Sequence, residues 1–148
     1  GALRLLTHEP FSKITLHSQT VLTPHPGEAA EMLKVTAKEI QKNRIESAKE
    51  LQKKYGCIIV LKGNGTIICN KDDTYLCSAG GPELAVAGSG DILSGVIGSL
   101  LAQGLAPYDA AKTGVGIHAR AGEEFAKDVG RIGLAAGELI PYIRKLLN

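Results

Sequence analysis

A carboxylate at the start of an apolar stretch is the feature of this sequence best suited to chemistry. Residues 87–91 read Ala-Gly-Ser-Gly-Asp, between a glycine- and alanine-rich stretch at 79–86 and an apolar stretch at 92–103 that predicts a largely buried helix. The first amides of a helix lack partners within it and carry partial positive charge, so they bind phosphate. Asp91 in that turn could take a proton from a hydroxyl that attacks a phosphoryl group. A structural interpretation competes, because first-turn aspartates also cap helices.

A second candidate phosphate site follows residues 57–61, an apolar run typical of a strand buried on both faces of a parallel sheet. It consists of Lys62, Gly63, Asn64, Gly65 and Thr66. Lysine supplies charge, glycine amides allow close approach, and threonine supplies a hydroxyl. The same residues also suit a hairpin turn, and residues 66–70 and 74–77 have the pattern of paired strands around a turn at 71–73. Both interpretations can hold together.

A histidine between two prolines is the third candidate. Residues 20–23 have the pattern of a short strand that stops at Pro24, and Pro26 follows His25. The prolines stiffen this turn and remove two donors, and a short helix is expected over residues 28–33. Loops that follow strands carry ligand contacts in α/β proteins. His25 is therefore a candidate ligand contact, with an exposed turn histidine as the alternative.

Helical patterns predict the elements that position these groups. Residues 36–55 are expected to form one helix, because a threonine and a glutamate match a capping box at its start. Its apolar stripe consists of Ile40, Ile45, Ala48 and Leu51. A second long helix is expected over 107–127, and a terminal helix over 134–147 that Pro141 kinks or divides. His118, inside the second helix, is interpreted as a packed or exposed residue rather than a ligand.

Composition limits the function classes. At 148 residues the chain is at most one ordinary domain, and 44% hydrophobic residues suffice for a core. A net charge of +2 and 4% aromatic residues argue against nucleic acid as a partner. No apolar run is long enough to span a bilayer, so no membrane partner is expected either.

The cysteine and histidine pattern argues against a zinc site. The three cysteines are odd in number, and the histidines do not pair with them at ligand spacings. Free buried thiols in a reducing, cytoplasmic compartment fit this pattern. The cysteines are Cys57, Cys69 and Cys77.

Three motifs occur in a fixed order along the chain: T-P-H-P-G-E at 23–28, L-K-G-N-G-T at 61–66 and G-G-P-E-L-A-V-A-G-S-G-D at 80–91. Together they resemble the ADP/ATP-dependent (S)-NAD(P)H-hydrate dehydratase family of the ribokinase-like superfamily, over nearly the whole chain. The resemblance implies a three-layer α/β/α fold with a mainly parallel central sheet. It also favours catalysis over capping for Asp91.

The resemblance further implies that residues 1–148 are the carboxyl-terminal part of one such domain. Family domains are considerably longer, and Gly1 stands where the family has an acidic residue in a D-A-L segment. An expressed piece, one chain of a nicked protein and a truncated gene product all fit this expectation. We expect association with the missing amino-terminal half or with copies of the chain.

The resemblance assigns roles to the candidate residues. His25 would contact the hydrated nicotinamide nucleotide, and the residues from Lys62 to Thr66 would line the adenine-nucleotide site. Gly88, Ser89 and Gly90 would form an anion hole, with Gly90 on the phosphate side of the nucleotide. Asp91 would contact the substrate hydroxyl and act as the base. Mg²⁺ would bridge the phosphates of ADP or ATP, with no metal ligand assigned to this chain.

The implied reaction is metabolite repair. Phosphorylation of the ring hydroxyl of hydrated NADH or NADPH, followed by elimination of phosphate, would restore the dinucleotide. Two alternatives remain. One is a small-molecule kinase of the same superfamily, such as a hydroxyethylthiazole or hydroxymethylpyrimidine kinase. The other is a non-catalytic fragment or subunit that contributes only a binding surface.

Overall fold

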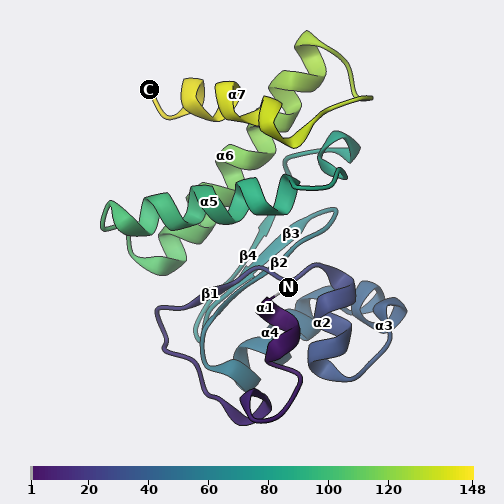
Figure 1. Cartoon of the computed structure of the whole chain (residues 1–148), viewed down its shortest axis with the longest axis vertical. Helices are drawn as coiled ribbons and strands as arrows, with labels where there is room; N and C mark the ends of the chain where they lie inside the picture. The colour runs from purple at the N-terminus through teal and green to yellow at the C-terminus, as the bar shows by residue number, and fades with distance from the viewer. Residues whose placement is uncertain (1) are drawn as a thin grey trace. The chain divides into compact units, whose positions relative to one another are not determined.

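The computed structural model describes residues 2–148, which form two compact units that divide between Leu76 and Cys77 (Figure 1). Each unit has its own sheet or helix packing and is described by itself. Gly1 lies outside the described residues, so the predicted loss of an acidic side chain there stays a prediction.

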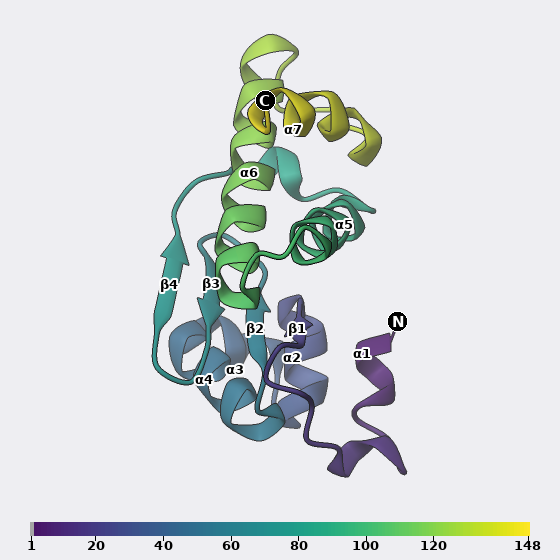
Figure 2. The same cartoon turned by 90° about the vertical axis from the view of Figure 1, so that its left-hand side faces the viewer.

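The amino-terminal unit contains the sheet, whose strand order is β1-β2-β3-β4 (Figure 2). The strands are β1 (Val21–Leu22), β2 (Ile58–Leu61), β3 (Thr66–Cys69) and β4 (Thr74–Cys77). β1 is parallel to β2, with Val21 opposite Ile58, and β2 is antiparallel to β3, with Leu61 opposite Ile67. The α/β class and the strands around residues 71–73 are confirmed. The sheet in this part of the chain is mixed, with one parallel pair.

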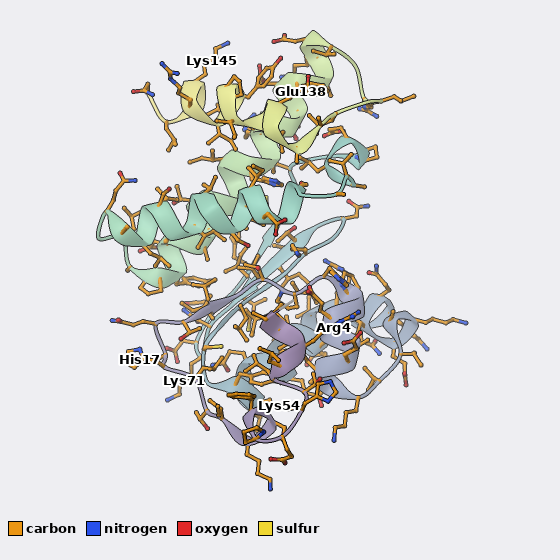
Figure 3. The ribbon with its side chains drawn as sticks, viewed as in Figure 1. Arg4, His17, Lys54, Lys71, Glu138 and Lys145 are labelled. Atoms are coloured by element: carbon orange, nitrogen blue, oxygen red, sulfur yellow. The ribbon has the colours of Figure 1, made fainter. Side chains whose placement is uncertain are left out.

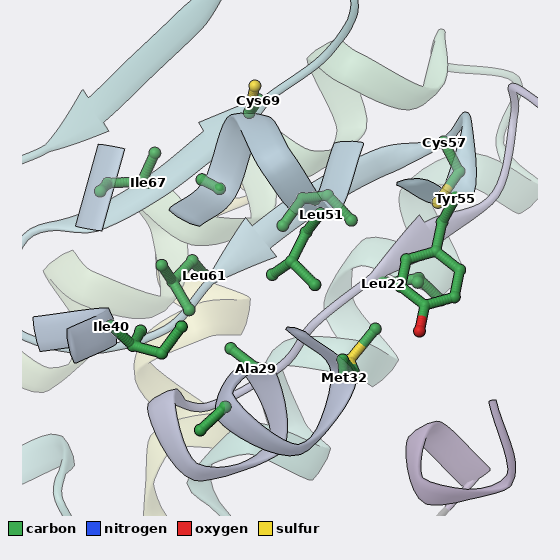
Figure 4. Packing of buried hydrophobic residues seen from close by; sticks show 13 residues of the cluster. Leu22, Ala29, Met32, Ile40, Leu51, Tyr55, Cys57, Leu61, Ile67 and Cys69 are labelled. Atoms are coloured by element: carbon green, nitrogen blue, oxygen red, sulfur yellow. The ribbon is translucent and has the colours of Figure 1, made fainter. Parts of the chain in front are cut away.

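The helices of this unit contribute to one apolar core together with the sheet. They are α1 (Ala2–Leu5), a 3-10 turn η1 (Phe11–Lys13), α2 (Pro26–Leu33), α3 (Ala37–Lys42) and α4 (Arg44–Tyr55). Met32 of α2, Leu51 of α4 and Leu61 of β2 belong to the same buried cluster (Figure 4). The Lys54 ammonium, labelled in Figure 3, donates to the Met32 carbonyl and ties α4 to the end of α2.

The prediction of one helix over residues 36–55 is wrong, because the chain breaks at Asn43. Asn43 has φ −132° and ψ 52°, so α3 ends before it and α4 begins after it. The predicted capping box is confirmed, since the Thr36 amide donates to Glu39 Oε2 at 2.8 Å and Thr36 Oγ1 accepts from the Glu39 amide at 3.2 Å. The break leaves Ile45 45% exposed, outside the predicted buried stripe.

The carboxyl-terminal unit is helical. It contains a 3-10 turn η2 (Pro82–Leu84), α5 (Ser89–Ala102), α6 (Pro107–Asp128), a 3-10 turn η3 (Ala136–Glu138) and α7 (Leu139–Leu146). Its core joins Leu100 of α5, Phe125 of α6 and Leu139 of α7. The second predicted long helix is confirmed as α6. The helix predicted over 92–103 begins at Ser89, and only one of its faces is buried.

The terminal helix starts later than predicted. α7 begins at Leu139, and the preceding turn is closed by a hydrogen bond from the Ala135 amide to Glu138 Oε2 at 2.8 Å, with Glu138 labelled in Figure 3. Pro141 therefore falls in the first turn of α7. Amides in a first turn have no partner inside the helix, so a proline there removes no helical hydrogen bond and does not divide the helix.

The cysteines agree with the sequence analysis. All three are free and buried, and burial raises the pKa of the Cys57 thiol to about 11. None of the helices in residues 2–148 combines the length and apolar character needed to cross a membrane.

Candidate functional site

His25 is held by its own helix. It is the N-cap of α2, and its Nδ1 accepts hydrogen bonds from the amides of Gly27 at 3.0 Å and Glu28 at 3.2 Å. The Glu28 carboxylate accepts from the His25 amide at 2.9 Å, which completes a capping box. α2 therefore begins at Pro26, two residues before the predicted start, since proline suits the first helical position.

These contacts leave one edge of the imidazole for other partners. Because Nδ1 is an acceptor, the proton of the neutral ring lies on Nε2. Nε2 is 3.5 Å from Glu28 Oε2, and the His25 side chain is 54% exposed. The histidine is thus an exposed turn residue, as the structural alternative held, and it also presents a fixed hydrogen-bond donor.

The predicted phosphate loop is a hairpin turn between β2 and β3. Thr66 Oγ1 donates to the Gly63 carbonyl at 3.2 Å, and Gly63 has φ +142°, a conformation that favours glycine. Lys62 is half-buried, whereas Gly63 and Asn64 are exposed. Within residues 2–148, no hydrogen bond of this loop uses the amides of Gly63, Asn64 or Gly65 as donors. The hairpin interpretation is confirmed, and the loop keeps donors for a ligand.

The structure brings the His25 turn and this loop to one edge of the sheet. They follow the carboxyl ends of β1 and β2, which are parallel neighbours. The Lys62 amide donates to the Pro24 carbonyl at 2.9 Å, so the loops are joined where they leave the strands. This edge is where α/β proteins bind ligands.

Sequence reasoning missed Arg44, which lies under the loop. Its guanidinium donates to the carbonyls of Gly65 at 2.9 Å, Leu61 at 3.3 Å and Lys62 at 3.4 Å. The sequence did not single out Arg44, because in the predicted continuous helix it would be one of several charged residues on the solvent-exposed face. The break at Asn43 makes Arg44 the first residue of α4.

In the carboxyl-terminal unit, the turn before α5 has the predicted form. Gly88 is the N-cap with φ +85°, and Asp91 lies in the first helical turn and is exposed. The Ser89 amide donates to the Val86 carbonyl at 3.3 Å, and the Asp91 amide donates to the Gly88 carbonyl at 3.0 Å. The anion-hole prediction therefore narrows to the amides of Gly88 and Gly90, which donate no hydrogen bond within the described part of the chain.

The capping interpretation of Asp91 can be tested against three other turns. Glu28, Glu39 and Glu138 each occupy the third position after a cap, and each carboxylate accepts a hydrogen bond from the cap amide. Asp91 occupies the same position after Gly88, but among residues 2–148 its carboxylate accepts no hydrogen bond that caps the helix. Its oxygens are therefore exposed and available to a ligand.

Two side chains of α6 form hydrogen bonds with the loop that precedes α5 and with its first residue. The Gly80 amide donates to Glu123 Oε1 at 2.9 Å, which fixes the start of the loop. His118, interpreted from the sequence as a packed or exposed residue, is buried, and its Nε2 lies 3.1 Å from Ser89 Oγ and 3.0 Å from the Ser89 carbonyl. Because Ser89 opens α5, the imidazole holds the turn that carries Asp91.

Replacing His118 with alanine is expected to lower the free energy of unfolding by about 1–3 kcal/mol, because a buried hydrogen-bond partner is lost. Urea unfolding of parent and variant measures this loss. Ser89→Ala is the matched control and should cost less, since the Ser89 carbonyl still faces the ring. A His118→Ala protein within about 0.5 kcal/mol of the parent would contradict this role.

The donor groups fit phosphate better than a bare cation. Across residues 2–148, no group of three or more histidine, cysteine, aspartate or glutamate side chains is arranged to hold a metal ion. In the amino-terminal unit, the Lys62 ammonium and the loop amides are hydrogen-bond donors. In the carboxyl-terminal unit, the first turn of α5 is the positive end of a helix dipole. A magnesium ion that arrives with a nucleotide is held by the phosphates, by water and by one or two carboxylates.

Comparison with known proteins adds a family to this geometry. A family model described as NAD(P)H-hydrate dehydratase matches residues 1–145. The bifunctional NAD(P)H-hydrate repair enzyme Nnr of Coxiella burnetii is 43% identical over 148 residues, which are 99% of this chain and 30% of that protein. The ADP-dependent (S)-NAD(P)H-hydrate dehydratase of Neisseria meningitidis is 41% identical over 86% of this chain and 44% of that protein.

A solved structure is similar as well. The ADP/ATP-dependent NAD(P)H-hydrate dehydratase of Bacillus subtilis, co-crystallised with ATP and Mg²⁺, is 37% identical with a TM-score of 0.82. The similarity covers 86% of this chain and 46% of that one. The chain thus spans less than half the length of these relatives.

Proposed function

The chain belongs to the NAD(P)H-hydrate dehydratase family, and from this premise we propose that the protein containing it uses ADP or ATP to dehydrate (S)-hydrated NADH and NADPH. The observation that carries the proposal is the exposed carboxylate of Asp91, which makes no capping hydrogen bond and lies in the same turn as the amides of Gly88 and Gly90. The relatives named above, an ADP-dependent dehydratase and one co-crystallised with ATP and Mg²⁺, support this choice of phosphoryl donor.

Asp91 is the base in this proposal. Its carboxylate takes the proton of the ring hydroxyl as the hydroxyl oxygen bonds to the terminal phosphorus, and the bond to the nucleotide's bridging oxygen breaks. The amides of Gly88 and Gly90 donate hydrogen bonds that stabilise the negative charge on the migrating phosphoryl group. Loss of this group as phosphate, together with a ring proton, restores the double bond of the dinucleotide.

The edge of the sheet supplies binding groups. Lys62 and the amides from Gly63 to Gly65 hold the nucleotide, and His25 donates from Nε2 to the hydrated dinucleotide. Mg²⁺ neutralises charge on the nucleotide phosphates when bound. The hydroxyl of Thr66 already closes the turn, so its role in nucleotide binding is to keep the loop in shape.

A direct assay tests the proposal. The protein containing this chain is incubated with hydrated NADH and either ADP or ATP with Mg²⁺, and NADH absorbance is followed. A nucleotide-dependent gain is expected. No gain would reject the dehydratase, and a stable phosphorylated product without NADH would favour the small-molecule kinase. The mass of the native protein in solution tests the expected association of this chain with copies of itself or with an amino-terminal half of the family domain.

His25 offers a substitution that separates capping from binding. His25→Asn keeps a good N-cap acceptor and should leave the unfolding temperature near that of the parent. It removes the Nε2 donor, so the KM for hydrated NADH is expected to rise about tenfold, the loss of one hydrogen bond. His25→Ala should have the same raised KM for hydrated NADH as His25→Asn, and a lower unfolding temperature than the parent. An unchanged KM in both variants would remove His25 from the substrate site.

A further inference from the structure

The guanidinium of Arg44 contacts three carbonyls in and beside the hairpin turn between β2 and β3, those of Leu61, Lys62 and Gly65. Its Nη1 also donates to Gln41 Oε1 at 3.1 Å, so a side chain of α3 helps to fix the orientation of the guanidinium. Arg44 is partly buried, and this desolvation lowers its pKa from the ordinary value, although a guanidinium stays charged at any physiological pH.

These contacts determine which way the loop amides point. In a trans peptide the carbonyl and the amide of the next residue point to opposite sides. The Leu61 carbonyl faces Arg44, and the Lys62 amide in the same peptide accordingly donates away from it, to the Pro24 carbonyl. The Lys62 carbonyl also faces Arg44, so the Gly63 amide is directed to the opposite, exposed side.

Gly63 is matched to this arrangement. A Cβ atom at position 63 would lie 2.6 Å from Arg44 Nη1, closer than real Cβ atoms approach a neighbour, and 3.1 Å from its Cζ, which is a tight contact. The absence of a side chain lets the guanidinium pack directly under the turn. Arginine and glycine therefore act together, although they are far apart in the sequence.

We propose that Arg44 is a positioning residue for the phosphoryl donor: by holding the peptides after Leu61 and Lys62, it presents the Gly63 amide and the Lys62 side chain to nucleotide phosphates. This inference rests on the proposed function, because it requires that the loop binds ADP or ATP. It assigns Arg44 no contact with the nucleotide or the hydrated ring.

Steady-state kinetics of Arg44→Met in the protein containing this chain tests the inference. The KM for ADP or ATP is expected to rise about tenfold or more, because the Gly63 amide and the Lys62 side chain, no longer held by Arg44, must be ordered when the nucleotide binds. The KM for hydrated NADH and kcat at saturating nucleotide should stay within about threefold of the parent, since Asp91 is untouched. A merely structural role would lower the amount of active enzyme and leave the nucleotide KM unchanged.

Two variants complete the experiment. Arg144→Met replaces an exposed arginine on α7 and should match the parent. Arg44→Lys keeps a charge but lacks the planar fork, so its nucleotide KM should lie between those of the parent and Arg44→Met. If Arg44→Met does not fold, Arg44→Lys decides: a nucleotide KM raised at least about threefold supports the inference.

The outcomes separate this inference from the proposed function. An active parent whose nucleotide KM is unchanged in both Arg44 variants overturns the positioning role and leaves the dehydratase in place. A parent that neither binds ADP or ATP nor restores NADH overturns the proposed function and, with it, the premise of the inference.

Discussion

Asp91→Asn is expected to lower kcat by about 10²–10⁴-fold, the range that a general base contributes. Asparagine has nearly the same shape and cannot accept the proton of the attacking hydroxyl. The carboxylate accepts no capping hydrogen bond from the backbone of α5, so the substitution should leave the unfolding temperature and the nucleotide KM close to those of the parent.

Nucleotide-dependent recovery of NADH measures the effect, and Asp109→Asn provides a matched control. Asp109 is an exposed carboxylate in the first turn of α6, where it pairs with Lys112 at 3.0 Å. Its substitution should leave kcat unchanged. An Asp91→Asn enzyme within tenfold of the parent would show that the carboxylate serves the helix rather than the reaction.

Lys62→Met is expected to raise the KM for ADP or ATP by roughly 10- to 100-fold, since a hydrogen bond to a charged phosphate contributes about 1.5–3 kcal/mol. The half-buried Lys62 backbone stays in place, because its amide and carbonyl contact Pro24 and Arg44. The KM for hydrated NADH should change little.

Lys71→Met is the control for this charge effect. Lys71, labelled in Figure 3, lies in the turn between β3 and β4, whereas Lys62 follows β2. Isothermal titration with ADP should show weaker binding for Lys62→Met, partial recovery for Lys62→Arg and no change for Lys71→Met. Equal loss in both methionine variants would indicate a general effect of charge rather than a contact at position 62.

Patterns that depend on neighbouring residues were predictable from sequence. The apolar run at 57–61 predicted β2, and Thr36 and Glu39 predicted a capping box, because each signal lies within a few residues of the structure it specifies. The position of Asp91 in the first turn of α5 was predictable for the same reason, since glycines precede an apolar stretch.

Contacts between distant residues were not predictable. Arg44 reaches carbonyls 17 to 21 residues away, and His118 reaches Ser89 across 29 residues. No local periodicity encodes such pairs, because they depend on how helices pack. The break at Asn43 was missed because the residues on either side of it, Lys42 and Arg44, favour helix.

The hydrogen bond between the Lys62 amide and the Pro24 carbonyl involves no side-chain atom. The spacing between the two loops is therefore insulated from most amino-acid replacements in either of them, and proline at position 62 is the replacement that would delete the donor. Substitutions in either loop can therefore change the side chains that meet a ligand while the backbone contact keeps the distance between the loops.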